Sequence, residues 1–179
     1  MSAVKQRIVY CSVAAVLTLV SQLYPNSLRT SQEGLKLLSG YEDCTLSSYS
    51  DSVGVPTCGI GHTKGVRMGT IATPEKVAQW FVEDVLEAEQ CVIRYFNGVE
   101  MPQPVFDSTV SLVYNVGCYG ARWNTKLNKP TSIARYSRAG DWMGTCEHLA
   151  DFRKAGGKVI QGLVNRRAKE QAWCLTYRQ

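Results

Sequence analysis

Apolar positions recur at helical spacing over most of this chain, and one short polar region interrupts them. Periods of three to four residues predict helices over residues 73–96, 104–116, 131–139, 141–151 and 161–176. Another helix is expected over residues 30–42, with Thr30 as its N-cap, and Thr73 is the expected N-cap of the helix over residues 73–96. Residues 44–69 are rich in Gly, Ser and Thr and predict a small β-hairpin. The pattern indicates an α+β fold that is mostly helical.

The first apolar run, Ile8–Val20, follows the basic residues Lys5 and Arg7. Basic residues ahead of a short apolar run are typical of export signals, and they keep the preceding end in the cytoplasm. As a helix this run spans about 20 Å, less than the roughly 30 Å of a bilayer's hydrocarbon core. We therefore expect residues 1–24 to be a signal anchor weak enough to leave the membrane, with a cleaved signal peptide as the alternative. Residues 25–179 are expected to form one domain.

Charge and cysteine content indicate the cellular compartment of the protein and the class of partner that it binds. The formal net charge is +5 and the pI is about 8.8, which favours anionic partners. The basic residues are scattered, so nucleic-acid binding is not expected. Seven widely separated cysteines without a Cys-x-x-Cys spacing suit disulfides in an oxidising compartment, and the odd number leaves at least one thiol unpaired. We expect an exported protein with no metal or other cofactor.

The polar region carries a candidate catalytic group. Glu42 precedes the expected hairpin, Asp51 follows nine residues later at its start, and Thr57 lies six residues beyond on the return strand. Two carboxyl groups across a cleft can cleave a glycosidic bond, one as a protonated acid and one as a carboxylate that acts on water. A Thr57 hydroxyl that shares this water with Asp51 would predict inversion of the anomeric carbon. By spacing alone the signal is weak, because such carboxylate pairs occur by chance.

The same stretch resembles the phage-type lysozymes, glycoside hydrolase family 24. The positions that carry the resemblance are Glu42, Tyr49, Asp51, Gly54, Thr57, Gly59, Gly61 and His62. Residues 106–118 are similar to the central helix of this family, and residues 156–175 to its closing helix. Together with the N-terminal run, the pattern is most similar to the signal-anchor-release endolysins of temperate phages.

The resemblance implies a lysozyme-like fold, with a small N-terminal β-hairpin lobe and a helical lobe after the signal-anchor helix. It implies an endolysin muramidase that hydrolyses the β-1,4 bond between N-acetylmuramic acid and N-acetylglucosamine and lyses the host cell. Glu42 would be the catalytic acid, and Asp51 and Thr57 would complete the triad. Asn115 and His62 are candidate substrate contacts, although His62 also suits a structural role. The expected protein is a monomer that acts on peptidoglycan, tethered to the host inner membrane and later periplasmic.

The cysteines suggest a switch. Cys44 follows Glu42 by two residues, Cys58 directly follows Thr57, and Cys11 lies in the apolar run. We hypothesise that Cys44 first bonds Cys58 and exchanges to Cys11 when the anchor leaves the membrane; a static Cys44–Cys58 link is the alternative. Some anchor-release relatives have a cysteine at the second catalytic position, where this chain has Asp51. The remaining cysteines are expected to form two helix-linking bridges of unknown pairing: Cys91, Cys118, Cys146 and Cys174.

Three alternatives stay open. Glu33 also precedes the hairpin, but its distance of 18 residues from Asp51 does not fit the motif, and it suits a capping role better. A zinc amidase would need more ligands than the two histidines, His62 and His148, readily supply. A wall-binding module without catalysis would share the fold and the export signal.

Overall fold

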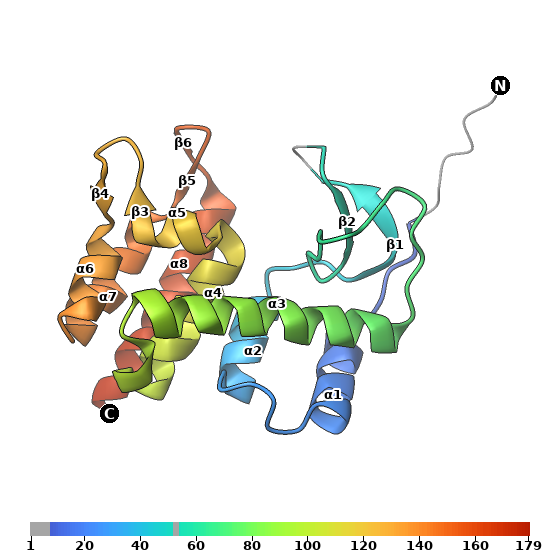
Figure 1. Cartoon of the computed structure of the whole chain (residues 1–179), viewed down its shortest axis with the longest axis horizontal. Coiled ribbons are helices and arrows are strands. Elements are labelled where there is room, and N and C mark those ends of the chain that lie inside the picture. The colour runs from blue at the N-terminus through green and yellow to red at the C-terminus, as the bar shows by residue number, and fades with distance from the viewer. Residues whose placement is uncertain (1–7, 52–53) are drawn as a thin grey trace. The chain divides into compact units, whose positions relative to one another are not determined.

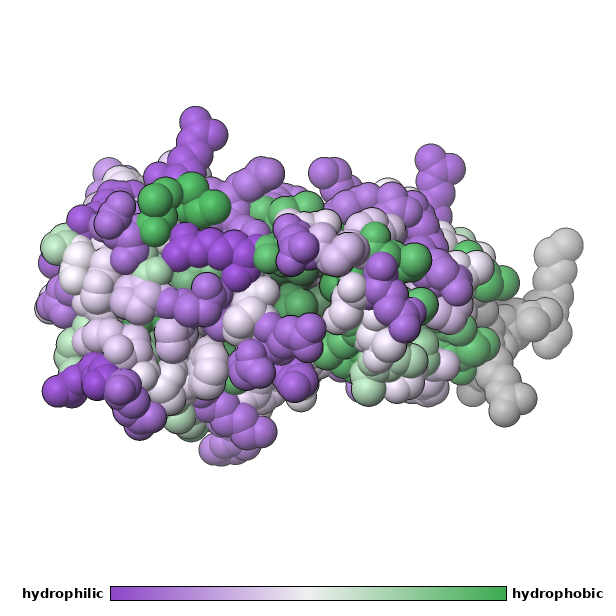
Figure 2. Space-filling model, turned by 90° about the horizontal axis from the view of Figure 1, so that it is seen from below, coloured by the Kyte–Doolittle hydropathy of each residue, from purple (hydrophilic) through white to green (hydrophobic). Residues whose placement is uncertain are grey.

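A computed structural model describes residues 8–51 and 54–179 (Figure 1). The chain divides into two compact units, described separately below. Unit 1 contains the residues up to Leu28 together with Ser39–Asp84, and unit 2 contains Arg29–Leu38 and Val85–Gln179. The basic residues Lys5 and Arg7 of the expected export signal lie outside the described residues. Ser52 and Val53, at the tip of the expected hairpin, lie outside them as well. On the face seen in Figure 2, hydrophilic and hydrophobic side chains are interspersed.

Unit 1 is built around a two-stranded antiparallel sheet of β1 (Thr45–Ser50) and β2 (Pro56–Gly59). Helix α1 (Val13–Leu23) and the first half of α3 (Pro74–Tyr95) complete it. Thr45, Tyr49 and Thr57 are residue types that favour strands, and glycines with positive φ stand before and after β2 and at its end. The expected small β-hairpin is confirmed.

The N-terminal apolar run divides into an extended segment and a helix. Cys11 donates its amide to the Cys44 carbonyl and Leu46 donates to the Val9 carbonyl, so the extended segment lies along one edge of β1. Ser12 then caps α1, where Val16 is fully buried and Val20 nearly so. Across residues 8–51 and 54–179, the structure contains no helix whose length and apolar character would suit a membrane crossing.

Unit 2 is helical, and α4 lies at its centre because every residue from Val105 to Val113 is buried. Helices α8, α5 and α7 pack against it. Its elements are α2 (Gln32–Ser39, of which all but Ser39 belongs to unit 2), the part of α3 from Val85 onward, η1 (Gly98–Glu100), α4 (Gln103–Val116), α5 (Cys118–Arg122), β3 (Trp123–Asn124), β4 (Lys129–Pro130), α6 (Ser132–Arg138), α7 (Trp142–Glu147), η2 (His148–Asp151), β5 (Lys154–Ala155), β6 (Lys158–Val159), α8 (Gln161–Cys174) and η3 (Leu175–Arg178). The mostly helical prediction is confirmed, and the short hairpins β3–β4 and β5–β6 are additions to it.

The helix predicted over residues 30–42 is shorter than expected at both ends. Ser31, not Thr30, caps α2: its hydroxyl accepts a hydrogen bond from the Gly34 amide at 3.0 Å. Thr30 instead donates to the buried Glu89 carboxylate at 2.7 Å, an interaction that only the tertiary structure provides. At the other end α2 stops at Ser39, so Glu42 lies beyond the helix and not at its end. The capping role of Thr73 on α3 is confirmed by a hydrogen bond from the Lys76 amide at 3.2 Å.

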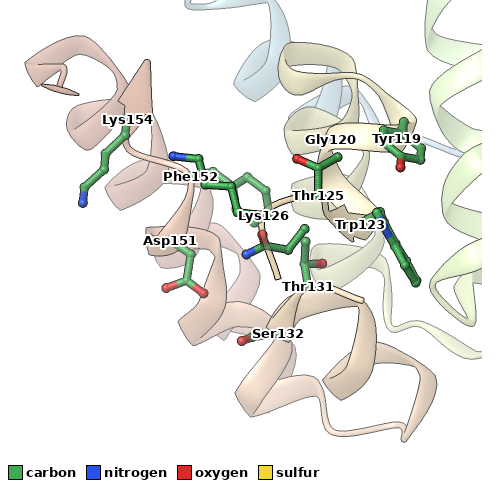
Figure 3. Close-up of a pocket in the computed structure, with 11 residues that line it drawn as sticks. Tyr119, Gly120, Trp123, Thr125, Lys126, Thr131, Ser132, Asp151, Phe152 and Lys154 are labelled. Atoms are coloured by element: carbon green, nitrogen blue, oxygen red, sulfur yellow. The ribbon is translucent and has the colours of Figure 1, made fainter. Parts of the chain in front are cut away.

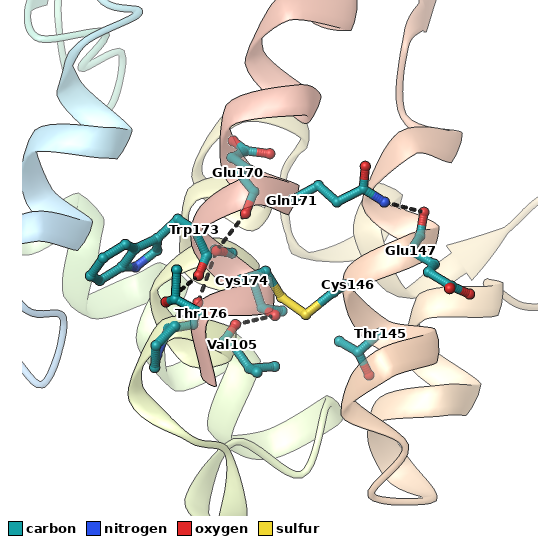
Figure 4. Close-up of a disulfide and its surroundings, with 12 residues drawn as sticks. Val105, Thr145, Cys146, Glu147, Glu170, Gln171, Trp173, Cys174 and Thr176 are labelled. Carbon is teal, nitrogen blue, oxygen red and sulfur yellow. Dashed lines mark hydrogen bonds between the residues drawn. A yellow bond between two sulfur atoms is a disulfide. The ribbon is translucent and has the colours of Figure 1, made fainter. Parts of the chain in front are cut away.

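Buried charge and two disulfides hold unit 2 together. Glu170 on α8 is fully buried, and both Arg167 and Ser111 bond its carboxylate, the former at 2.8 Å and the latter at 2.6 Å. Cys146 is bonded to Cys174, which joins α7 to α8 beside this cluster (Figure 4). A second bridge, Cys91–Cys118, joins α3 to the start of α5.

Candidate active site

The centre of the candidate site is the strand pair of unit 1. Tyr49 on β1 lies directly opposite Thr57 on β2. The pairing continues past the strand end, because the Asp51 amide donates to the Val55 carbonyl at 3.0 Å. Side chains alternate along a strand, and directly opposed residues share a face. Tyr49, Asp51 and Thr57 therefore present their side chains on one face of the sheet.

Short backbone contacts fix the orientation of Asp51 and Thr57. The Asp51 Oδ1 atom accepts a hydrogen bond from the Val55 amide at 2.8 Å. The Thr57 hydroxyl donates to the Val55 carbonyl at 3.0 Å, and Thr57 is 3% exposed. Because its only proton is used in that bond, the Thr57 oxygen can act toward a water molecule only as an acceptor.

Glu42 reaches the same region from the connection that follows α2. Its amide donates to the Ser39 carbonyl at 3.1 Å, which makes a turn after the helix. The Glu42 Oε2 atom lies 3.6 Å from the point where a Cβ on Gly61 would stand. Gly61 follows β2 with a φ of 76°, a conformation that favours glycine. The carboxyl group of Glu42 therefore lies over the turn at the end of β2, whereas Asp51 lies at the start of that strand.

The pKa of the Tyr49 phenol is affected by charges at both ends of this arrangement. Burial raises the pKa of Tyr49 above its ordinary value, and the negative charges of Asp43, Glu42 and Asp51 raise it further. Glu42 and Asp51, nine residues apart in sequence, therefore both contribute to the electrostatic environment of one tyrosine. Tyr49 is a site residue that the sequence indicated only as part of a motif, without a role.

His62 occupies a structural position in unit 1. Its Nδ1 atom lies 2.8 Å from the Asp84 carboxylate, its Nε2 atom lies 2.9 Å from the Lys64 carbonyl, and its ring stacks on Trp80. The side chain is buried. A substrate contact by His62 would have to replace one of these partners, so the structural role weighed from sequence suits the geometry better.

Asn115 lies in the other unit, near the end of α4. Its side-chain oxygen accepts a hydrogen bond from Arg167 at 3.3 Å. The structure therefore groups Glu42, Asp51 and Thr57 in unit 1, with Asn115 placed in unit 2. The predicted sugar contact of Asn115 stays a prediction.

The cysteines next to the site differ in state. Cys11 is bonded to Cys44, while Cys58 is a free and fully buried thiol. The Cys58 sulfur lies 3.7 Å from the carbonyl oxygen of Thr45, the residue after Cys44. Burial raises the pKa of the Cys58 thiol. The structure therefore contains the Cys11–Cys44 bond that was expected after the exchange. Cys58, the expected first partner of Cys44, lies close to this bond as a free thiol.

Unit 2 has a groove of its own, with a volume of about 520 Å³ (Figure 3). Aromatic side chains, hydroxyl groups and charges of both signs line it: Tyr119, Trp123, Thr125, Lys126, Thr131, Ser132, Asp151, Phe152 and Lys154. They come from α5, the β3–β4 hairpin, the start of α6 and the segment around β5. Sequence analysis missed this groove, because its walls are separated in the chain and no local spacing unites them.

No group of three His, Cys, Asp or Glu side chains within the described part of the chain could hold a metal ion. Two carboxyl groups and a hydroxyl suit acid–base hydrolysis of a glycoside.

Comparisons with known proteins agree with this chemistry. The family model described as phage lysozyme matches residues 39–170. The SAR-endolysin of Escherichia phage P1 is 35% identical over 170 residues, which cover 93% of this chain and 91% of that protein. The crystal structure of the active form of P1 phage endolysin Lyz matches with a TM-score of 0.86 at 34% identity, over 94% of this chain and 96% of that one. Its secreted inactive form matches with a TM-score of 0.61 at 31% identity, over 83% and 96%.

Proposed function

The chain belongs to the phage lysozyme family and is a glycoside hydrolase of peptidoglycan that serves host lysis, and we propose that Glu42, Asp51 and Thr57 are its catalytic residues. The observation that supports this assignment is the placement of the three residues on one strand pair: the Glu42 carboxyl group lies over Gly61 at the end of β2, and Asp51 and Thr57 are both bonded to Val55 ahead of its start. Family membership favours this activity over a zinc amidase or a wall-binding module without catalysis.

The proposed reaction uses the two ends of the strand pair. Glu42 in its acid form protonates the glycosidic oxygen between N-acetylmuramic acid and N-acetylglucosamine, so the C–O bond breaks as the leaving group takes the proton. A water molecule donates one hydrogen bond to Asp51 and the other to the Thr57 oxygen. Its lone pair attacks the anomeric carbon from the opposite face while Asp51 accepts its proton. The product is the inverted, α-configured sugar.

Glu42→Gln tests the acid. We expect the rate of cleavage of purified sacculi to fall by roughly 10²–10⁴-fold, since an amide cannot donate a proton as a general acid. Glu33→Gln, on the exposed first turn of α2, is the matched control and should keep the wild-type rate. Wild-type cleavage should produce reducing sugar ends and no new amino groups, with the α-anomer first in proton NMR. A Glu42→Gln protein with the wild-type rate would refute the assignment, and a β-anomer would refute inversion.

The groove in unit 2 is proposed as a second contact with the polymer. Tyr119, Trp123 and Phe152 offer flat apolar surfaces suited to sugar rings, while Lys126 and Asp151 carry opposite charges. Peptidoglycan presents sugars together with peptides that bear both carboxylate and ammonium groups. The groove matches that mixture better than it matches a uniformly anionic ligand.

Export is proposed to proceed through residues 1–24 as a signal anchor, after which the enzyme is a periplasmic monomer. The relatives named SAR-endolysins support this route. The anchor would then take the form seen here, with Val16 and Val20 of α1 buried in unit 1. Fractionation of host cells should find the protein first with the inner membrane and then in the periplasm at full length. Size-exclusion chromatography should give the mass of one chain.

The cysteine exchange is proposed to accompany release. While the anchor is in the membrane, Cys44 would be bonded to Cys58. After release, the Cys11 thiolate attacks the Cys44 sulfur, the Cys44–Cys58 bond breaks, and Cys58 leaves as a thiolate that takes up a proton. One disulfide is exchanged for another, so no external oxidant is needed. The Cys11–Cys44 bond and the free Cys58 thiol correspond to the final state.

A further inference from the structure

Large apolar side chains are exposed on two segments of unit 1, the N-terminal residues 8–10 and the loop at residues 63–72. Ile71 in the loop is 80% exposed, and Tyr10 in the N-terminal segment is 67% exposed. The two segments also expose Ile8, Val9 and Met68. An exposed apolar side chain standing alone needs no explanation, whereas a group of them on neighbouring segments indicates an interaction site.

The two segments are neighbours because both are bonded to the same residues of β1. The Leu46 amide donates to the Val9 carbonyl at 2.6 Å, and the Leu46 carbonyl accepts from the Ala72 amide at 2.8 Å. The Ser47 hydroxyl accepts from the Val9 amide at 2.9 Å, and Ser47 forms a β-bridge with Ile71. Val9 and Ile71 therefore lie beside one residue. The five exposed apolar residues of the two segments are called the apolar edge below: Ile8, Val9, Tyr10, Met68 and Ile71.

Hydrogen bonds hold the loop at residues 63–72 in its conformation. The Ser48 amide donates to the Thr70 carbonyl at 2.9 Å, and the Gly69 amide donates to the Ser48 hydroxyl at 2.9 Å. Within the loop, the Thr70 amide donates to the Arg67 carbonyl at 3.0 Å and closes a turn. The exposure of the apolar side chains is thus a property of a loop that is fixed to β1 at several points.

Basic residues accompany the apolar edge. Lys64 and Arg67 are exposed on the same loop, which contains no acidic residue. Lys5 and Arg7 precede Ile8 in the sequence, and no acidic residue lies among the first ten. Apolar side chains next to cations suit the surface of an anionic bilayer, because the apolar groups enter the boundary between headgroups and acyl chains while the cations meet the phosphates.

We propose that the apolar edge, together with Lys64 and Arg67, docks the folded enzyme on the surface of an anionic phospholipid bilayer. The inference goes beyond the proposed function and takes from it only the export of the protein, which places the enzyme beside the host inner membrane. Peptidoglycan is polar and offers no acyl chains to side chains such as Ile71, so the apolar edge suits lipid better than the substrate. Residues 8–10 belong to the apolar run of the proposed signal anchor, and this segment would therefore contact lipid both before and after release.

Co-sedimentation of the full-length enzyme with lipid vesicles tests the proposal. The enzyme should bind vesicles of phosphatidylglycerol and phosphatidylethanolamine more tightly than vesicles of phosphatidylcholine, and added NaCl should weaken the binding because it screens the basic residues. Ile71→Ser should lower the partition coefficient about tenfold, because it removes much of the transfer free energy of one large apolar side chain. Val9→Ser should lower it in the same direction. Val99→Ser, an exposed valine on η1 of unit 2, is the matched control and should bind like the wild type.

A charge variant separates the two contributions to docking. Arg67→Gln should weaken binding to the anionic vesicles at low salt and have little effect at high salt, where the charge is already screened. Wild-type binding by both Ile71→Ser and Arg67→Gln would overturn the proposal, as would an enzyme that binds neither kind of vesicle.

Two further measurements exclude other occupants of the apolar edge. If Ile71→Ser lost binding to purified sacculi and not to vesicles, the surface would belong to the substrate and the proposal would fail. If size-exclusion chromatography found a dimer that Ile71→Ser abolished, the surface would belong to a second copy of the chain, and the proposal would fail as well. Glu42→Gln should bind the vesicles like the wild type whether or not it cleaves sacculi, so the docking surface and the catalytic residues are tested independently.

Discussion

Cys11 is bonded to Cys44, two residues after Glu42, so the N-terminal segment is covalently attached to the stretch that carries the proposed acid. Hydrogen bonds from the Cys11 and Leu46 amides hold the same two segments together. The N-terminal segment is thus held to the chain close to the Glu42 turn by a disulfide and by backbone hydrogen bonds.

Cys11→Ser should lower the activity of the released enzyme, because the exchange would stop with Cys44 still bonded to Cys58. We expect non-reducing peptide mapping to find the Cys44–Cys58 bond in this variant and the Cys11–Cys44 bond in the wild type. Cys58→Ser is the complementary variant and should be active as soon as it is exported. Unchanged release and activity in Cys11→Ser would show that no exchange takes place.

Thr57→Val should reduce cleavage by about 10²-fold, because the branched shape is kept while the acceptor for the catalytic water is lost. Thr57→Ser keeps the oxygen and should retain most of the activity. The comparison uses initial rates on purified sacculi at matched folded fractions. Equal rates for the Val and Ser variants would assign Thr57 a packing role only.

The Cys58 thiol should react slowly in the folded protein. Burial raises its pKa, so less thiolate is present at a given pH than for an exposed cysteine, and the reaction should accelerate as the pH rises. Titration with a thiol reagent in urea, without reductant, should find one thiol per chain. A rapid native reaction at neutral pH, or three thiols in urea, would contradict the cysteine states described here.

Lys126→Ala tests the groove of unit 2. Loss of a charge that lines the groove should weaken binding of the polymer, which raises KM several-fold and leaves kcat nearly unchanged. Lys129→Ala is the control, since Lys129 lies on the same hairpin but does not line the groove. If both variants gave the same KM, the groove would have no part in binding the substrate.

Asp107→Ala should destabilise unit 2 by about 3 kcal/mol, because it leaves several donors without their acceptor. Asp107 is fully buried and accepts hydrogen bonds from the Ser31 amide at 3.0 Å, the Gln103 side chain at 2.7 Å and the Trp173 ring at 3.2 Å. Glu87→Ala, an exposed acidic residue on α3, should cost far less. Urea unfolding measures both, and equal midpoints would show that this network contributes little.

The sequence by itself determined the features that depend on neighbouring residues. Helical periodicity located the long helices, and Thr73 capped α3 as expected, because a cap needs only an amide three residues away. Glycine, serine and threonine content located the hairpin. The motif from Glu42 to His62 identified the family, since its residues occupy one continuous stretch of chain.

Only the tertiary structure decided which distant groups meet. Thr30 bonds Glu89 and leaves the cap of α2 to Ser31, a choice that no local pattern contains. The pairing of Cys91 with Cys118 and of Cys146 with Cys174 was one of three possibilities that the sequence could not separate. The same holds for Glu42, whose carboxyl group lies over Gly61 at the end of β2. Contacts of this kind depend on packing in three dimensions, because the residues that meet are far apart in the sequence.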